Sequence, residues 1–294
     1  MIVARGWRLP NVMHYVGLPL LLLFAWDTLI AALYVGLHQK WVSAGELPMP
    51  LIGSALAIFI SLRNNNAYAR WSEARQLWGG VVNYSRTLAR QVRLYLPGDP
   101  AADTVVRLQV AYAHALRCHL RRQDCRDEIA HLIDSGTQER LRGASNVPDA
   151  LLGEIADLLA ALRSGTLDTI QLAAFDGTLA ALANMQGGAE RLKNTPMPRQ
   201  YTVFPRVFVQ LFCLLLPLAM VADLGWATPL GSTLVGFIFL ALDRVGGDLE
   251  DPFENRIYDV PLTSITRTIE INLRQGLGHD GLPQPLTPVD GVLW

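Results

Sequence analysis

Lysine is almost missing from this chain of 294 residues: there are two, Lys40 and Lys193, against 23 arginines. Charged residues make up 17% of the sequence, whereas soluble domains carry about 25%. The formal net charge is −1, which excludes a uniform positive field for holding nucleic acid. Hydrophobic residues reach 51%, which excludes a disordered chain. The composition argues against an ordinary soluble enzyme, and we expect no nucleic-acid partner.

Motifs for catalysis and metal binding are also scarce. The patterns GxxxxGK[ST], HExxH and GxSxG do not occur. The three cysteines, at 118, 125 and 213, lack the short pair spacing of a structural zinc site. We therefore expect no enzyme activity, no cofactor and no bound metal.

An acidic segment at 248–259 has enough carboxylates to suggest calcium by oxygen count. Arg256 lies inside this segment, and the segment does not follow the twelve-residue calcium-loop pattern. We favour a salt-bridged loop over a calcium site.

Four apolar runs carry the hydrophobic excess. They cover residues 16–37, 47–62, 207–222 and 228–242. As a helix the first run would be about 33 Å long, enough to cross a hydrocarbon core of about 30 Å. The other three are short for a span, so each alone also fits a buried core helix. Because the runs form two closely linked pairs, we predict four transmembrane helices.

Asp27 is the one charged residue within the first run. A carboxylate inside a membrane is costly and is a candidate for function. The alternative is a structural hydrogen bond to a hydroxyl group on a neighbouring helix.

The distribution of arginine predicts the orientation. Arg5 and Arg8 precede the first run, and the region between the two pairs is rich in arginine, whereas Lys40 is the one basic residue in the links within the pairs. Positive charge stays on the cytoplasmic side of a membrane. We predict that both termini and the large middle region are cytoplasmic.

The region between the two pairs shows the three-and-four spacing of helices. The second run continues without proline or glycine from Ala55 through Trp78, which predicts one long helix. Further helices are expected at about 101–123, from near Pro148, from near Asp168 and at about 264–276. We divide the chain into 1–62 (N-terminal segment and first two membrane helices), 63–203 (cytosolic helical region), 204–245 (last two membrane helices) and 246–294 (cytosolic C-terminal segment).

A stripe on the second run is the most informative feature. Ser54, Ile58 and Leu62 are spaced by four and share one helix face. Asn64, Asn65 and Asn66 follow directly. An apolar constriction that opens onto polar residues is how a dewetting gate is built. The alternative is a stripe that packs on neighbouring helices.

Four separated blocks resemble bacterial bestrophins. They are RNNNAYARWSEARQLWGGVVNYSR (63–86), NTPMPRQYTVFPRVFVQLFCLLLPLAM (194–220), DPFENRIYDVPL (251–262) and TSITRTIEINL (263–273). The resemblance implies an all-α membrane protein of the bacterial inner membrane, assembled as a homopentamer. Each subunit would contribute four transmembrane helices, continuous with a large helical cytosolic region, around one central pore for inorganic ions.

The resemblance also assigns residues. It places the pore neck at Ser54, Ile58 and Leu62, where Ser54 departs from the apolar pattern of the family. Asn65 and Asn66 would line the pore below the neck. A second, cytosolic aperture would lie at Ile170, with Asp168 beside it.

Selectivity and regulation follow less directly from the sequence. The calcium clasp of animal bestrophins follows an NPF-like triplet, here 251–253, and is interrupted by Arg256 and Ile257. The resemblance to bacterial members implies a cation-conducting channel. An anion (chloride) channel of the same architecture, a secondary transporter and a membrane scaffold are the alternatives.

Overall fold

The computed structural model describes residues 1–2 and 9–294, without the side chains of 9–15 and of Ser164. Arg5 and Arg8, which entered the prediction of orientation, lie outside the described residues. About 77% of the chain is helical. Two isolated β-bridges are the only extended pairing in the described part of the chain. The all-α class predicted from the sequence is confirmed.

Contacts divide the chain into two compact units. We call 5–70 together with 197–250 the apolar unit, and 71–196 together with 1–4 and 251–294 the arginine-rich unit. The long helix α2 (Met49–Tyr95) contributes its first part to the apolar unit and its second part to the arginine-rich unit.

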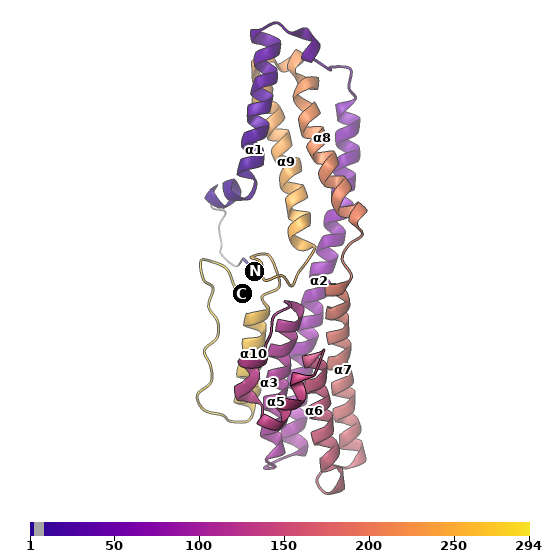
Figure 1. Ribbon diagram of the computed structural model, residues 1–294, viewed down its shortest axis with the longest axis vertical. Coiled ribbons are helices and arrows are strands. Elements are labelled where there is room, and N and C mark those ends of the chain that lie inside the picture. Colours follow the sequence, from indigo (N-terminus) through magenta and orange to yellow (C-terminus); the bar gives the residue numbers. More distant parts are fainter. Residues whose placement is uncertain (3–8) are drawn as a thin grey trace. The chain divides into compact units, whose positions relative to one another are not determined.

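In the apolar unit, each of the four predicted runs is helical. Besides the start of α2, the elements are α1 (Leu9–Ala31), the π-helical turn η1 (Ala32–Gly36), the 3-10 turn η2 (Lys40–Val42), α8 (Arg199–Leu224), the 3-10 turn η5 (Gly225–Ala227) and α9 (Thr228–Leu249). Helices α1, α8 and α9 run side by side (Figure 1). Two continuous helical stretches, Val16–Gly36 and Arg199–Leu249, are long and apolar enough to cross a membrane. The second contains both α8 and α9, which meet at Gly225 with a positive φ of 50°.

The apolar unit exposes large aliphatic side chains on its outer faces. Leu18 on α1 is 70% exposed and Leu230 on α9 is 72% exposed. Soluble monomers rarely leave contiguous apolar surface of this kind in water. The surface therefore suits lipid or neighbouring subunits.

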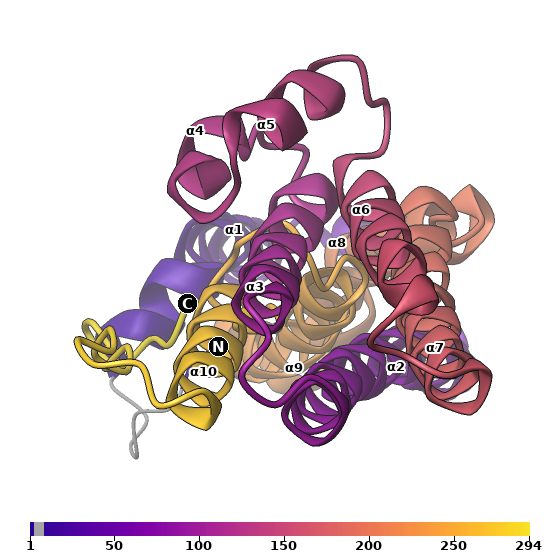
Figure 2. The same cartoon turned by 90° about the horizontal axis from the view of Figure 1, so that it is seen from below.

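In the arginine-rich unit, α3 is buried along nearly its whole length. The elements besides the end of α2 are α3 (Ala101–Leu120), α4 (Arg126–Ile129), η3 (Ala130–Leu132), α5 (Ser135–Arg142), α6 (Val147–Ala161), η4 (Leu162–Ser164), α7 (Thr169–Asn194) and α10 (Leu262–Gly276). Figure 2 shows α3 between α6 and α10, which both pack against it. The helices predicted near 101, 148, 168 and 264 are confirmed. Helices α4 and α5 were not predicted, because they are short and polar.

Helices α2 and α7 run antiparallel within this unit and interlock through small residues. A Cβ atom at Gly188 of α7 would lie 2.6 Å from the Leu77 side chain of α2. The relationship is reversed at Gly80 of α2, where a Cβ atom would meet the side chain of Met185. Further along, Gln91 Nε2 donates a hydrogen bond to the carbonyl oxygen of Ala174 at 2.9 Å.

The two ends of the chain pair with each other. Ile2 forms an antiparallel bridge with Val292. The backbone N–H of Leu293 donates to the carbonyl oxygen of Met1 at 2.8 Å. The two termini therefore lie together in the arginine-rich unit.

Candidate functional site

The first part of α2 has one buried face and one exposed face. Met49, Leu56 and Ile60 are buried in an apolar cluster with residues of α8. On the opposite face, Ile58 is 65% exposed and Leu62 is 55% exposed. Residues spaced by three and four share a helix face, which explains the separation. The predicted stripe therefore does not pack against the rest of its own chain.

Ser54 continues this exposed stripe toward the start of α2. Its hydroxyl group donates a hydrogen bond to the carbonyl oxygen of Leu51 at 2.9 Å. A serine hydroxyl bonded to its own helix has less hydrogen-bonding capacity left for water. The polarity that the sequence indicates at this position is thus partly masked.

The three consecutive asparagines separate into two roles. Asn64 Nδ2 donates to the carbonyl oxygen of Leu242 on α9 at 2.9 Å, and a Cβ atom at Gly246 would collide with the Asn64 side chain. Asn65 and Asn66 are exposed. Asn64 therefore joins α2 to α9. Asn65 and Asn66 expose their side-chain amides directly after the stripe along α2.

Asp168 and Ile170 lie at the start of α7. Asp168 is the N-cap: its carboxylate accepts from the backbone N–H of Gln171 at 2.8 Å, and the Gln171 side chain accepts from the backbone N–H of Asp168 at 3.0 Å. This reciprocal capping box gives Asp168 a structural role. Ile170 is 81% exposed, the most exposed large apolar side chain among the described residues. At this exposure, packing within the described part of the chain does not account for an isoleucine at this position.

An ion pair between α2 and α9 was not predicted. The guanidinium group of Arg63 is 1% exposed and pairs with the carboxylate of Asp243, which is 14% exposed. Arg206 of α8 approaches the same carboxylate at 3.9 Å. The sequence signal was an arginine directly after one apolar run and an aspartate directly after another.

Asp27 follows the structural alternative that the sequence left open. It is fully buried, and Thr233 Oγ1 of α9 donates a hydrogen bond to its carboxylate at 2.9 Å. This bond ties α1 to α9.

The acidic segment forms a network of local contacts in each unit. In the arginine-rich unit, Glu254 pairs with Lys193, and Asp259 accepts a hydrogen bond from the backbone N–H of Arg256 at 2.9 Å. Burial raises the pKa of Asp259 to about 6. Among the described residues, no group of three or more histidine, cysteine or acidic side chains is arranged to hold a metal ion.

The polar cluster at the end of α3 likewise consists of protein partners. His114 Nδ1 lies 2.9 Å from a carboxylate oxygen of Glu128, which also pairs with Arg117. Hydrogen bonds from Cys125 and Arg117 lower the pKa of Cys118 to about 6. This network joins α3 to α4.

An all-α chain whose apolar helices expose leucine and isoleucine is a helical membrane protein. The chain belongs to the bacterial/fungal bestrophin family, whose model matches residues 6–275. The bestrophin-like fold expected from the sequence, with four membrane helices continuous with a large helical region, is confirmed by this match and by solved structures.

Two curated relatives are similar over most of their length. The voltage-dependent anion channel-forming protein YneE of Salmonella typhi is 37% identical over 242 residues, 82% of this chain and 80% of the relative. The voltage-dependent anion channel-forming protein RSc3414 of Ralstonia nicotianae is 36% identical over 287 residues, 95% of this chain and 91% of the relative. A crystal structure of a bacterial bestrophin homologue from Klebsiella pneumoniae has a TM-score of 0.87 and 34% identity, covering 90% of this chain and 100% of that chain.

These relatives change the expected selectivity. The family and the curated relatives support an ion channel. The expectation of cation conduction is not supported, because both curated relatives carry the name of an anion channel-forming protein. The alternative of an anion channel is favoured.

Proposed function

We propose that the protein is a passive anion channel of the bacterial inner membrane, with its neck at Ser54, Ile58 and Leu62. The observation that carries the proposal is the exposure of this stripe: Ile58 is 65% and Leu62 is 55% exposed although they lie on a helix in the apolar unit. Narrow apolar constrictions gate ion flow by expelling water.

The stripe of one helix cannot enclose a pore, so symmetry must supply the ring. The bestrophin family implies five copies around one axis, with each copy contributing one stripe. Asn65 and Asn66 would then offer amides to ions that leave the neck. Neutral amides and apolar side chains carry no net charge, so the anion preference in this proposal rests on the names of the relatives.

Ile170 is our candidate for a second, cytosolic aperture. Its 81% exposure supports a position on a surface that assembly covers or that faces the ion path. Asp168, its predicted companion, has its carboxylate engaged in capping α7. We retain Asp168 as a neighbour of the aperture and assign the constriction to Ile170.

Both chain ends are proposed to lie in the cytoplasm with the region 63–203. The pairing of Met1 with Leu293 supports a common side for the two termini. The arginine content of the middle region supports the cytoplasm as that side.

A planar-bilayer recording under a tenfold potassium chloride gradient tests the proposal. An anion channel would reverse near the chloride equilibrium potential, which is about 59 mV from zero for one elementary charge. Reversal near the potassium potential would show a cation channel. Saturable transport without unitary steps would favour a transporter, and an ion-impermeable assembly would favour a scaffold.

A further inference from the structure

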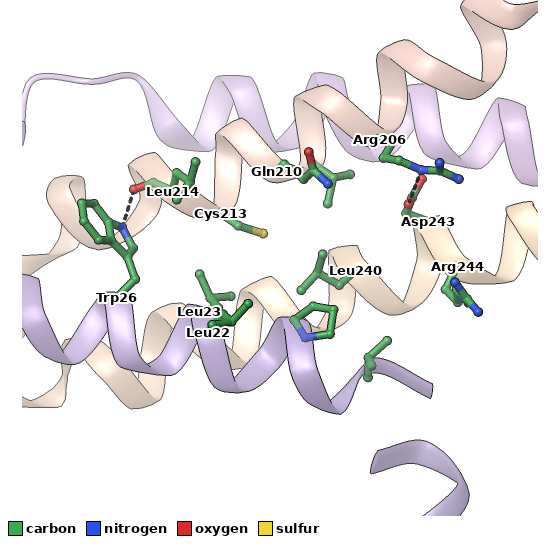
Figure 3. A pocket seen from close by; sticks show the side chains of 13 residues that line it. Leu22, Leu23, Trp26, Arg206, Gln210, Cys213, Leu214, Leu240, Asp243 and Arg244 are labelled. Carbon is green, nitrogen blue, oxygen red and sulfur yellow. Dashed lines mark hydrogen bonds and ion pairs between the residues drawn. The ribbon is translucent and has the colours of Figure 1, made fainter. Parts of the chain in front are cut away.

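A cavity of about 450 Å³ lies within the apolar unit between α1, α8 and α9 (Figure 3). Pockets that bind small organic molecules have volumes of roughly 300–1,000 Å³. The cavity is distinct from the exposed stripe of α2, because none of its lining residues belongs to α2.

The cavity is apolar at one end and charged at the other. Figure 3 shows Leu22, Leu23 and Trp26 of α1 along the apolar part, with Leu214 of α8 facing Trp26. The indole N–H of Trp26 already donates to the carbonyl oxygen of Leu214 at 3.1 Å. The indole therefore offers the cavity an apolar ring whose polar atom is satisfied.

At the other end lie Arg206 and Gln210 of α8 with Asp243 and Arg244 of α9 (Figure 3). Arg206 is 56% exposed and its contact with Asp243 is long, 3.9 Å. The same Asp243 carboxylate already holds the buried Arg63.

Arg244 is the second arginine at this end of the cavity. It is 60% exposed, and its guanidinium lies 3.8 Å from the carboxylate of Asp248. The charged residues that line the cavity are two arginines, Arg206 and Arg244, and one aspartate, Asp243. By formal charge the lining therefore carries one more positive than negative group, and both guanidinium groups are exposed.

A long apolar wall that ends in guanidinium groups matches an amphiphile with an anionic head. Guanidinium groups bind phosphate through two parallel hydrogen bonds, and basic pockets between membrane helices bind anionic lipid headgroups. We propose that this cavity binds an anionic phospholipid, with an acyl chain along Leu22, Leu23 and Trp26 and the phosphate between Arg206 and Arg244. Such a lipid would fill the space between α1 and the α8–α9 pair.

The test measures binding of dioleoyl phosphatidylglycerol to the purified, detergent-solubilised channel by native mass spectrometry. Dioleoyl phosphatidylcholine has the same acyl chains but a zwitterionic head, and inorganic phosphate has no chains. We expect phosphatidylglycerol to bind about tenfold more tightly than phosphatidylcholine. Phosphate alone should not raise the melting temperature at equal concentration.

Two variants locate the site. The double variant Arg206→Gln/Arg244→Gln should lose about tenfold in affinity for phosphatidylglycerol and little for phosphatidylcholine. Arg199→Gln neutralises an exposed arginine on the same helix outside the cavity and should bind as the parent does. Arg206, Arg244 and Arg199 all have exposed side chains, so we expect each variant to fold. Thermal melting in lipid-free detergent checks this.

Three outcomes would overturn the proposal. They are equal binding of the two lipids, unchanged phosphatidylglycerol affinity in the double variant, and full stabilisation by phosphate alone, which would indicate a simple anion site. Binding is measured without ion flux, so failure here is distinguishable from failure of the channel proposal.

Discussion

Arg63 and Asp243 join α2 to α9 by an ion pair whose guanidinium group is almost fully buried. Arg63 directly follows Leu62 on the exposed stripe, so the pair fixes the end of the stripe to a neighbouring helix. Removing one partner of a buried pair leaves an uncompensated charge, which costs more than the pair itself contributes.

We predict that Arg63→Ala or Asp243→Asn alone destabilises the protein by about 3–5 kcal/mol. The double variant Arg63→Met/Asp243→Leu should recover most of this loss, because it buries no unpaired charge at either position. Thermal unfolding in detergent and the yield of assembled protein measure the effect. A double variant less stable than both single variants would contradict the explanation.

The neck assignment predicts a gain of ion flux. Ile58→Ala and Leu62→Ala each remove apolar volume from the stripe, which widens the constriction and makes its wetting easier. Chloride efflux from liposomes should rise several-fold in either variant.

Ile52→Ala is the matched control for these neck variants. It is the same substitution as Ile58→Ala and lies on the same helix, but Ile52 lies in the groove that α2 forms with α8. Its efflux should match that of the parent. Parental flux in both neck variants would show that the neck lies elsewhere.

Two variants at the N-terminal end of α7 should affect different properties, one the ion permeability ratio and the other the stability. Ile170→Ala should shift the anion-to-cation permeability ratio while leaving stability almost unchanged, because Ile170 is 81% exposed in its own chain. Asp168→Ala should cost about 1 kcal/mol of stability through loss of the N-cap. Reversal potentials and thermal melts, measured on both variants, separate the two roles. An unshifted permeability ratio in Ile170→Ala would argue against an aperture at this position.

The raised pKa of Asp259 predicts a specific pH dependence of the protein's stability. Burial raises the pKa of this carboxyl to about 6, above its value in an unfolded chain of about 3.9. The ionised carboxylate therefore costs stability at neutral pH, and this cost disappears as the pH falls from 6 to 4.

The variant Asp259→Asn should accordingly melt at a higher temperature than the parent at pH 7.5. The difference should shrink steadily and vanish near pH 4. A difference that is independent of pH would show that the carboxylate is not the cause.

Local patterns made much of the fold predictable. The three-and-four spacing of apolar residues identified α2 and α3, and Asp168 followed by Gln171 carries the signature of the cap that begins α7. Short polar helices such as α5 lack that periodicity. The apolar runs identified the membrane helices because length and hydropathy are local properties of the chain.

The site was predictable only in part, because contacts between distant residues leave little local trace. Arg63 and Asp243 are 180 residues apart, so the sequence around one of them does not indicate that the other is its partner. Asn64 could not be separated from Asn65 and Asn66 by sequence, since only the packing of α9 against α2 distinguishes it.

The interlocked glycines of α2 and α7 restrict how the tip of α7 can move. Leu77 fits over Gly188, and Met185 fits over Gly80, so axial sliding in either direction would drive a large side chain against a neighbouring turn. The hydrogen bond from Gln91 to the carbonyl oxygen of Ala174 holds the same alignment five residues after Thr169, where α7 begins. Any change in the width of an aperture at Ile170 must therefore come from a joint tilt of α2 and α7, or from movement of whole subunits. Sliding of α7 alone along its axis would not produce it.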